Sequence, residues 1–340
     1  ILNRQMTFMN LKSLPFLLCI CLSWTNLIGQ DIHFTRFYDA PITLNPAKTG
    51  DYLGTFRAGG IIRDQNYNLS HVYVTPSVYV DAPIIKGFRA NHWVGVGLTF
   101  LQDQAGAAGL KTSNFTGSAA YHIGLNKDLT SSITIGASYG LVARSVSDKN
   151  KILFEDGINN PVPSTDLMSI NDQKVNYGDI NAGLQYTLGL QEGGVVKMGF
   201  AVMHINKPKY GLVTSSASRM PMRFNIYGTA DAPIAEKIDI IPALYVSTMA
   251  GQRDIALQIA GGYKLNSLKG NRIIGGVGYR FGDAVQLLAG MDIKNTKIGI
   301  SYDITLNAIK PTGGFELSVS HIFMIYKKPK DNPVILCPRI

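Results

Sequence analysis

Several features of membrane and secreted proteins are missing from this chain of 340 residues. It has no run of 18 apolar residues and no helical heptads, and its mean hydropathy is only +0.08, which argues against a helical membrane protein. It has 3 cysteines, and Cys19 and Cys21 lie in an N-terminal apolar stretch that we expect to be removed. The mature chain would keep Cys337 alone, so it could form no internal disulfide.

Local catalytic and metal-binding patterns are also weak. The six histidines are too scattered for their spacing to indicate a metal site; they are His33, His71, His92, His122, His204 and His321. Residues 136–140 match a nucleophile-elbow pattern, but that chemistry needs the serine on a turn between a strand and a helix, and Ser138 is expected in mid-strand. Nothing resembles a nucleic-acid site. We therefore expect no enzyme, no cofactor and no nucleic-acid partner.

The chain does contain a two-residue alternation of apolar with small or polar residues, repeated in segments of about ten residues. Near the end of the chain, Ile298, Ile300 and Tyr302 alternate with Gly299 and Ser301. Successive side chains of a strand point to opposite faces, so one face would contact lipid and the other a polar lumen. The 35 glycines suit crowded, bent strands and the 16 tyrosines suit interfacial girdles. This pattern predicts an all-β transmembrane barrel.

The alternation predicts about fourteen antiparallel strands, an even number as in bacterial single-chain barrels. They cover residues 52–62, 72–82, 93–101, 113–123, 131–144, 176–189, 194–205, 222–230, 238–249, 252–263, 271–280, 283–293, 296–304 and 314–325. If the first strand starts in the periplasm, the long connections over residues 102–112, 145–176 and 206–221 are extracellular. Residues 191–193 and 294–295 would then be tight periplasmic turns.

The ends of the chain predict three further regions. Arg4 and Lys12 accompany an apolar stretch from Leu14 to Trp24, which predicts a secretory signal peptide over residues 1–29. Residues 30–51 would form an N-terminal segment that lies in the barrel as a plug, or alternatively covers it as a periplasmic lid. The barrel would occupy residues 52–326, and residues 327–340 would form a short periplasmic tail.

Charges of both signs fall on the predicted lumen face: Arg57, Arg144, Asp179, Lys197, Asp239, Arg280, Asp292, Lys297, Asp303 and Glu316. Because unpaired buried charges are costly, they predict either ion pairs between strands or a permeation or ligand path. Asp-Ala-Pro-Ile also occurs at residues 39–42, 81–84 and 231–234. Proline cannot donate to a ladder, so we expect the last two copies to end strands, with a shared docking feature as the alternative.

The start of the mature chain carries a family resemblance. Residues 30–38 read Gln-Asp-Ile-His-Phe-Thr-Arg-Phe-Tyr, followed by Pro41, by Leu-Asn-Pro-Ala at residues 44–47 and by Gly50. This opening resembles that of the PorP/SprF family of Bacteroidota outer-membrane proteins. Similar motifs are Arg57 with Ile-Arg-Asp-Gln at 62–65, Tyr-Arg-Phe at 279–281, Gly-Ile-Ser-Tyr-Asp-Ile at 299–304 and Phe-Glu-Leu at 315–317. Ile42 and Thr43 depart from the more apolar or aromatic pair that is usual there.

The resemblance implies a non-enzymatic outer-membrane barrel of the type IX secretion system and gliding motility machinery. Such a barrel is expected to be required for export or surface anchoring of a partner adhesin or another type IX substrate. Its other expected partners are type IX secretion components and outer-membrane lipid. An outer-membrane transporter or channel for small or apolar solutes is the alternative, and solute uptake would reveal it. A membrane-embedded hydrolase would rest on Ser138 alone.

Two groups of residues are candidates for binding. Lys327, Lys328, Lys330 and Arg339 place four positive charges in a proline-broken tail that cannot add another strand, so the tail could contact a partner, or could be a solvated end. On the lumen face the candidates are Arg57, Arg280, Asp303 and Glu316.

Overall fold

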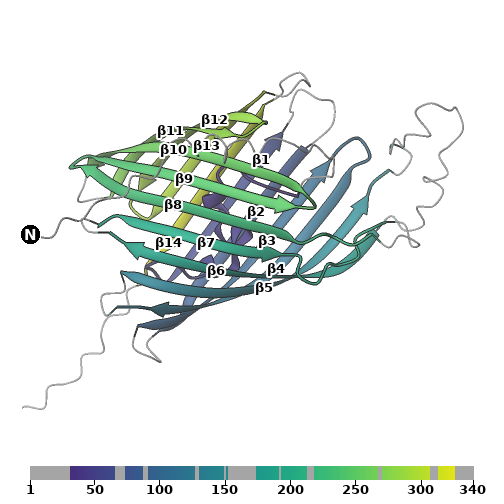
Figure 1. Cartoon of the computed structure of the whole chain (residues 1–340), viewed down its shortest axis with the longest axis horizontal. Helices are drawn as coiled ribbons and strands as arrows, with labels where there is room; N and C mark the ends of the chain where they lie inside the picture. Colours follow the sequence, from purple (N-terminus) through teal and green to yellow (C-terminus); the bar gives the residue numbers. More distant parts are fainter. Residues whose placement is uncertain are drawn as a thin grey trace, which may run out of the picture.

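The computed structural model of the chain is a closed barrel of fourteen antiparallel strands (Figure 1). It describes residues 31–65, 73–86, 91–126, 130–148, 151, 174–190, 193–212, 218–266, 270–306 and 313–325. The strands are β1 (Phe56–Gln65), β2 (Tyr73–Lys86), β3 (His92–Ala105), β4 (Leu110–Gly124), β5 (Ser131–Val146), β6 (Lys174–Gly189), β7 (Val195–Met203), β8 (Arg223–Ala235), β9 (Ile238–Met249), β10 (Gln252–Asn266), β11 (Asn271–Arg280), β12 (Ala284–Ile293), β13 (Thr296–Thr305) and β14 (Gly314–Phe323). The predicted fold class and strand number are confirmed.

Each strand pairs with its neighbours in sequence, and β1 pairs with β14 to close the barrel. The closing register runs from Phe56 opposite Phe323 to Gln65 opposite Gly314. Closure removes the unpaired strand edges that an open sheet would expose to lipid. Among the residues that the structure describes, no helix is long and apolar enough to cross a membrane.

The two faces of the wall follow the alternation. In β14, Val319 is 51% exposed, whereas Ser318 and Glu316 are 3% and 1% exposed. In β5, Ile135 points outward and Thr134 inward in the same way. The outer face is apolar because it contacts lipid, and the inner face carries the buried polar and charged side chains.

The expected limits of β1, β3 and β4 were wrong. β1 begins at Phe56 rather than Tyr52, because the Tyr52 hydroxyl donates a hydrogen bond to the Asp81 carbonyl while the chain still crosses from lumen to wall. Residues 102–112 form no long loop, since β3 and β4 continue into a tight turn. In that turn Gly106 and Gly109 adopt φ of +74° and +61°, a conformation that glycine reaches at little cost.

The prolines of the repeated tetrapeptide do not end strands, so that prediction was also wrong. Pro83 lies within β2 and Pro233 within β8. The pairing register shifts between Pro83 and Ile85, and again between Pro233 and Ala235. Such a bulge leaves one position out of the ladder, which lets a strand continue past a residue that cannot donate.

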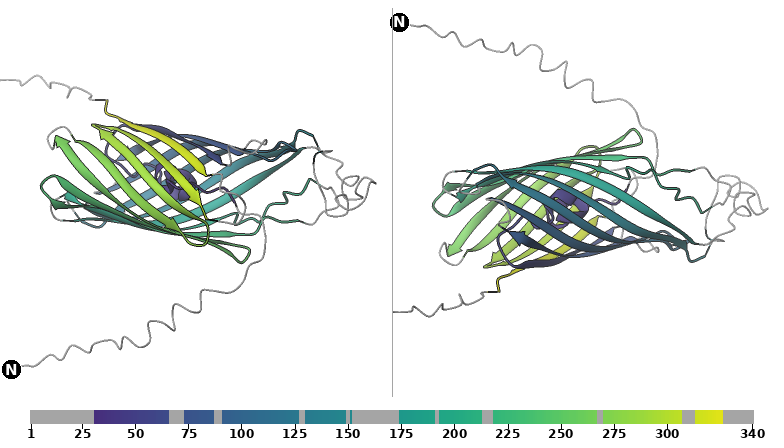
Figure 2. Two further views of the ribbon diagram at one scale, coloured as in Figure 1. Left: turned by 90° about the horizontal axis from the view of Figure 1, so that it is seen from above. Right: turned by 90° about the horizontal axis from the view of Figure 1, so that it is seen from below.

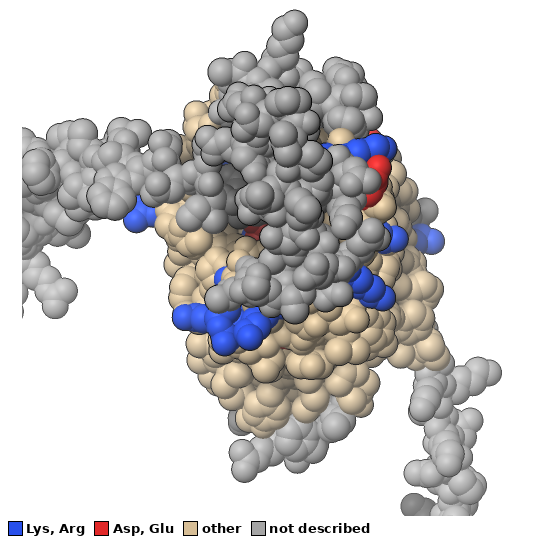
Figure 3. Space-filling view, turned by 90° about the vertical axis from the view of Figure 1, so that its right-hand side faces the viewer, with Lys and Arg blue, Asp and Glu red and all other residues tan. Residues whose placement is uncertain are grey.

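The two ends of the barrel differ in their connections. Residues 147–173 and 204–222 join strands at one end, whereas turns such as 236–237 and 294–295 join them at the other. Outer-membrane barrels have short periplasmic turns and longer extracellular loops, so β1 starts at the periplasmic end. Figure 3 looks onto the extracellular end, where basic side chains lie around the rim; Lys207, Lys209 and Arg219 are exposed in the connection from β7 to β8.

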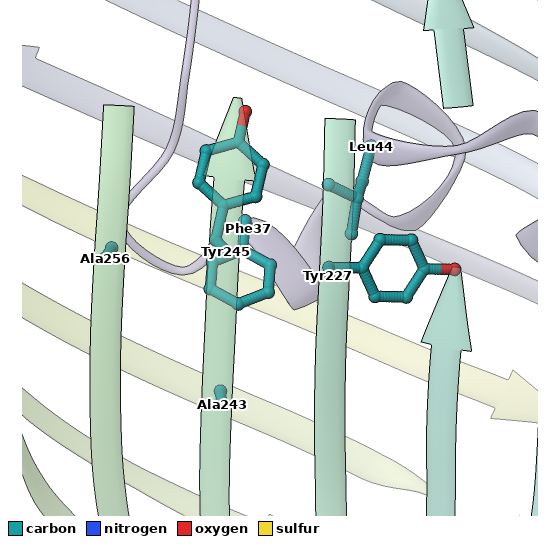
Figure 4. Packing of buried hydrophobic residues seen from close by; sticks show 6 residues of the cluster. All are labelled: Phe37, Leu44, Tyr227, Ala243, Tyr245 and Ala256. Atoms are coloured by element: carbon teal, nitrogen blue, oxygen red, sulfur yellow. The ribbon is translucent and has the colours of Figure 1, made fainter. Parts of the chain in front are cut away.

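Residues 31–51, hereafter the N-terminal segment, lie inside the barrel (Figure 2). The segment contains the short helices η2 (Phe37–Asp39), α2 (Pro41–Leu44) and η3 (Pro46–Lys48). Phe37 and Leu44 form a buried apolar cluster with four wall residues, Tyr227, Ala243, Tyr245 and Ala256 (Figure 4). The rings of Phe37 and Tyr245 stack with 5.1 Å between their centroids.

Candidate functional site within the barrel

The N-terminal segment runs along the lumen from the extracellular end toward the periplasmic end. At its start, the Asp31 carboxylate accepts hydrogen bonds from Arg223, the first residue of β8, at 2.7 Å and from His204 at 3.3 Å. At its other end, the Gly50 amide donates to Asp81 at 2.7 Å, and the Trp93 indole donates to the Gly50 carbonyl at 3.1 Å. The chain therefore traverses the lumen before it enters β1.

A buried charge cluster holds the first part of the segment. The backbone amides of Thr35 and Arg36 donate to the two carboxylate oxygens of Glu316 at 2.7 and 2.8 Å. The Thr35 hydroxyl lies 2.7 Å from an Asp303 oxygen and accepts from Arg63 at 2.9 Å and from Arg280 at 2.8 Å. Arg63 also pairs with Asp303 and Glu316. All four charged side chains are less than 5% exposed, and the segment adds hydrogen-bond partners to charges that already pair with one another.

The middle of the segment is held by close packing on glycine. The Asn45 side chain caps η3 by accepting from the Ala47 amide at 2.8 Å, and it donates to the Leu184 carbonyl of β6 at 2.9 Å. A methyl group at Gly183 would overlap the Asn45 side chain, and one at Gly136 would overlap the backbone at Ala47. These two glycines on the inner wall allow the segment to approach this closely.

The aspartates of the three Asp-Ala-Pro-Ile copies make the same kind of contact in the structure. Each forms an ion pair with an arginine on the inside of the barrel: Asp39 with Arg36, Asp81 with Arg57, and Asp231 with Arg272. Asp39 also accepts from Ser318 of β14 at 2.6 Å, and Asp81 accepts from the Gly50 amide. Sequence reasoning treated the prolines as the meaningful residues and missed these aspartates, although Asp39 joins the N-terminal segment to β14 and Asp81 binds the segment from β2.

The structure places the four candidate lumen residues inside the barrel but in two groups. Arg280, Asp303 and Glu316 surround Thr35, whereas Arg57 lies nearer the periplasmic end and pairs with Asp81 at 2.8 Å. The other candidates lie elsewhere on the inner face. Four of them form ion pairs: Asp179 with His204, Lys197 with Asp51, and Asp239 and Asp292 with Arg272. The Arg144 guanidinium lies over the ring of Tyr210, and Lys297 lines a cavity. Sequence reasoning missed Arg63 and Arg223, although Arg63 has the same strand parity as Arg57. Residues 1–29, where a signal peptide is expected, and Lys327, Lys328, Lys330 and Arg339 lie outside the described residues.

In the part of the chain that the structure describes, Ser138 has no general base. Its hydroxyl accepts a hydrogen bond from Asn181 at 3.2 Å, while His204 directs one ring nitrogen to Asp179 at 2.8 Å and the other to Asp31. Burial lowers the pKa of His204, but its hydrogen bonds to Asp179 and Asp31 outweigh that effect and raise the pKa to about 9. A protonated imidazole between two carboxylates cannot accept the proton of a serine. Among the described residues, no group of three His, Cys, Asp or Glu side chains could hold a metal ion.

Comparison with known proteins decides the family. The family model described as "Type IX secretion system membrane protein PorP/SprF" matches residues 26–321. The chain belongs to the PorP/SprF family. This PorP/SprF protein is therefore an outer-membrane barrel associated with type IX secretion. The search of curated proteins found no match.

Solved structures similar to this PorP/SprF barrel are distant in sequence. The toluene transporter TodX of P. putida is 13% identical, with a TM-score of 0.48 over 83% of this chain and 93% of that chain. The translocator domain of the autotransporter NalP from Neisseria meningitidis is 11% identical, with a TM-score of 0.40 over 80% of this chain and 89% of that chain. Neither likeness carries information about what this protein binds.

Proposed function

We propose that this PorP/SprF protein is a non-enzymatic component of type IX secretion, required for export or surface anchoring of a partner adhesin or similar substrate. We propose further that its N-terminal segment closes the lumen, so that the protein acts by binding rather than by conducting solutes. The observation that carries this proposal is the set of contacts that the segment makes with the wall: hydrogen bonds from the backbone amides of Thr35 and Arg36 to Glu316, and the ion pair of Asp31 with Arg223.

The energetics support a segment that stays in place. A hydrogen bond to a charged group contributes about 1.5 to 3 kcal/mol. Withdrawal of the segment would remove such bonds from Glu316, Asp303 and Arg223 at once, while Glu316 and Asp303 would keep their ion pairs with Arg63. The outer face of the strands contacts lipid, so a secreted partner and other secretion components are left with the loops, the termini and the two ends of the barrel as contact surfaces.

The test compares a strain lacking this protein with the same strain carrying the wild-type gene. We expect loss of the adhesin from the cell surface, measured by antibody labelling of intact cells, and unchanged uptake of small solutes. Purified protein in liposomes should give no swelling in sugar solutions. Swelling with normal adhesin display would instead support the transporter or channel for small or apolar solutes.

The tail is proposed as one contact with the secretion machinery through Lys327, Lys328, Lys330 and Arg339. Truncation after Tyr326 should leave the barrel in the outer membrane but abolish adhesin display. Normal display from the truncated protein, at normal abundance, would remove the tail from the proposal and direct attention to residues 147–173.

A further inference from the structure

A cavity of about 280 Å³ lies between the N-terminal segment and the wall in the periplasmic half of the barrel. It extends from Gln258 in β10 to Asn295 in the turn between β12 and β13. One side is formed by the segment, including Lys48 and Asp51. The cavity is therefore reached from the end at which the short turns lie.

The acidic side chains that line the cavity already have cationic partners. Asp39 pairs with Arg36, and Asp51 with Lys197. On the wall, Arg272 pairs with both Asp231 and Asp292, at 2.6 and 2.7 Å. Each of these carboxylates therefore has a cationic partner within ion-pair distance, and Asp231 and Asp292 share one arginine.

Two lysines that line the same cavity have no such partner. Lys48 is 7% exposed, and no carboxylate of the described residues lies within 4.0 Å of its ammonium group. Its nitrogen lies 3.5 Å from the Gln185 side-chain oxygen and 4.7 Å from the centre of the Tyr227 ring. Lys297 is exposed to the cavity and likewise lacks an ion pair among the described residues, because Asp292, its partner in the ladder, is held by Arg272.

The environment of Lys48 favours an incoming anion. Burial and the charge of Lys197 lower the pKa of Lys48 to about 7. A buried cation that lacks a counter-ion loses stability, and a carboxylate placed beside it would restore that stability. Apolar side chains of the wall also line the cavity, among them Ile241, Ala260, Ile274 and Leu288.

We infer that this cavity binds a carboxylate carried next to a small apolar group, with Lys48 and Lys297 as its cationic ligands. A peptide chain end and a free short-chain acid share this chemistry. A volume of about 280 Å³ admits one or two residues of a chain end but no folded domain. The site faces the periplasm, away from the surface on which an adhesin would be displayed, and it does not depend on the function proposed above.

The experiment is calorimetric titration of the purified full-length mature protein in detergent with three probes. These are acetyl-Gly-Ala-Val with a free carboxylate, its C-terminal amide, and isovalerate. We expect the peptide acid to bind and the amide to bind at least ten-fold more weakly, because a charge-assisted hydrogen bond is lost. Equal binding of peptide acid and isovalerate would assign the site to free acids, and a ten-fold preference for the peptide would assign it to chain ends.

Matched variants locate the site. Lys48→Met and Lys297→Gln should each weaken peptide binding about ten- to a hundred-fold, whereas Lys209→Gln at the extracellular end should leave it unchanged. Lys297 is exposed, so its variant should fold even if Lys48→Met does not; heat-modifiable gel mobility checks this. Equal affinity for acid and amide, wild-type affinity in the folded Lys297→Gln protein, or no binding of the acid at millimolar concentration would overturn the inference.

Discussion

Glu316→Ala should release the first part of the N-terminal segment while leaving the barrel assembled. The Glu316 carboxylate accepts from the backbone amides of Thr35 and Arg36 and pairs with Arg63, and it is 1% exposed. Alanine removes both hydrogen bonds to the segment and the ion pair with Arg63. It does not alter the strand pairing of β14, because those bonds are made by the backbone.

The magnitude follows from what remains after the substitution. A hydrogen bond to a charged group contributes about 1.5 to 3 kcal/mol, and Glu316 accepts two from the segment, so we expect a loss of at least about 3 kcal/mol. The Arg63 pair joins two wall strands and is lost whether the segment is docked or displaced, so it does not enter this difference. Every 1.4 kcal/mol changes an equilibrium ten-fold, so the population with the segment displaced should rise about a hundred-fold.

The assay is modification of a reporter cysteine at Ala40, which is 2% exposed, by a water-soluble maleimide in a Cys337→Ser background. Glu316→Ala should raise the modification rate about a hundred-fold when opening is fast relative to labelling. Glu236→Ala, at an exposed glutamate in a periplasmic turn, is the matched control. A change of less than three-fold in a correctly folded Glu316→Ala barrel would refute the argument that this cluster holds the segment.

Three further outcomes are expected. Val319→Arg, on the lipid face, should lower barrel stability by about 2 to 4 kcal/mol in folding titrations into lipid. Ser318→Arg should fold but displace the segment, because Ser318 donates a hydrogen bond to Asp39 inside the barrel. A cysteine at Ile32 should be labelled by an impermeant maleimide on intact cells, because the segment starts at the extracellular end. The pKa of the His204 imidazole is raised to about 9, and its protonated form contacts Asp31. The stabilisation from this contact is therefore complete below about pH 6.5 and is lost as pH rises through about 9. Labelling of Ile32→Cys should accelerate over that range.

Each of these has a result that would contradict it. Equal folding defects from Val319→Arg and Ser318→Arg would mean that the two faces of β14 are wrongly assigned. Labelling of Ile32→Cys only after the outer membrane is permeabilised would show that the segment starts at the periplasmic end. A cysteine at Asn295, in a periplasmic turn, is the control that should require permeabilisation. If His204→Gln shows the same acceleration with pH as the wild type, His204 is not the responsible group.

Sequence alone determined the number of strands, their order and the faces that they present. This succeeded because the two-residue alternation is a local property: Val319 and Ser318 point to opposite faces wherever the strand lies, and their polarity shows which face meets lipid. The same reasoning failed at strand limits. Pro83 and Pro233 were read as strand ends, but bulges formed with neighbouring strands carry the chain past them.

What fills the barrel was decided only by tertiary structure. Thr35 meets Glu316 across 281 positions of sequence, and Asp31 meets Arg223 across 192. No periodicity records such a pairing, because it depends on how closure of the barrel places the inner faces of β1, β8 and β14 around one segment. The sequence placed charges on the lumen face. Only the folded barrel shows that three of them, Arg280, Asp303 and Glu316, converge on Thr35, and that Lys48 and Lys297 line a cavity without a counter-ion among the described residues.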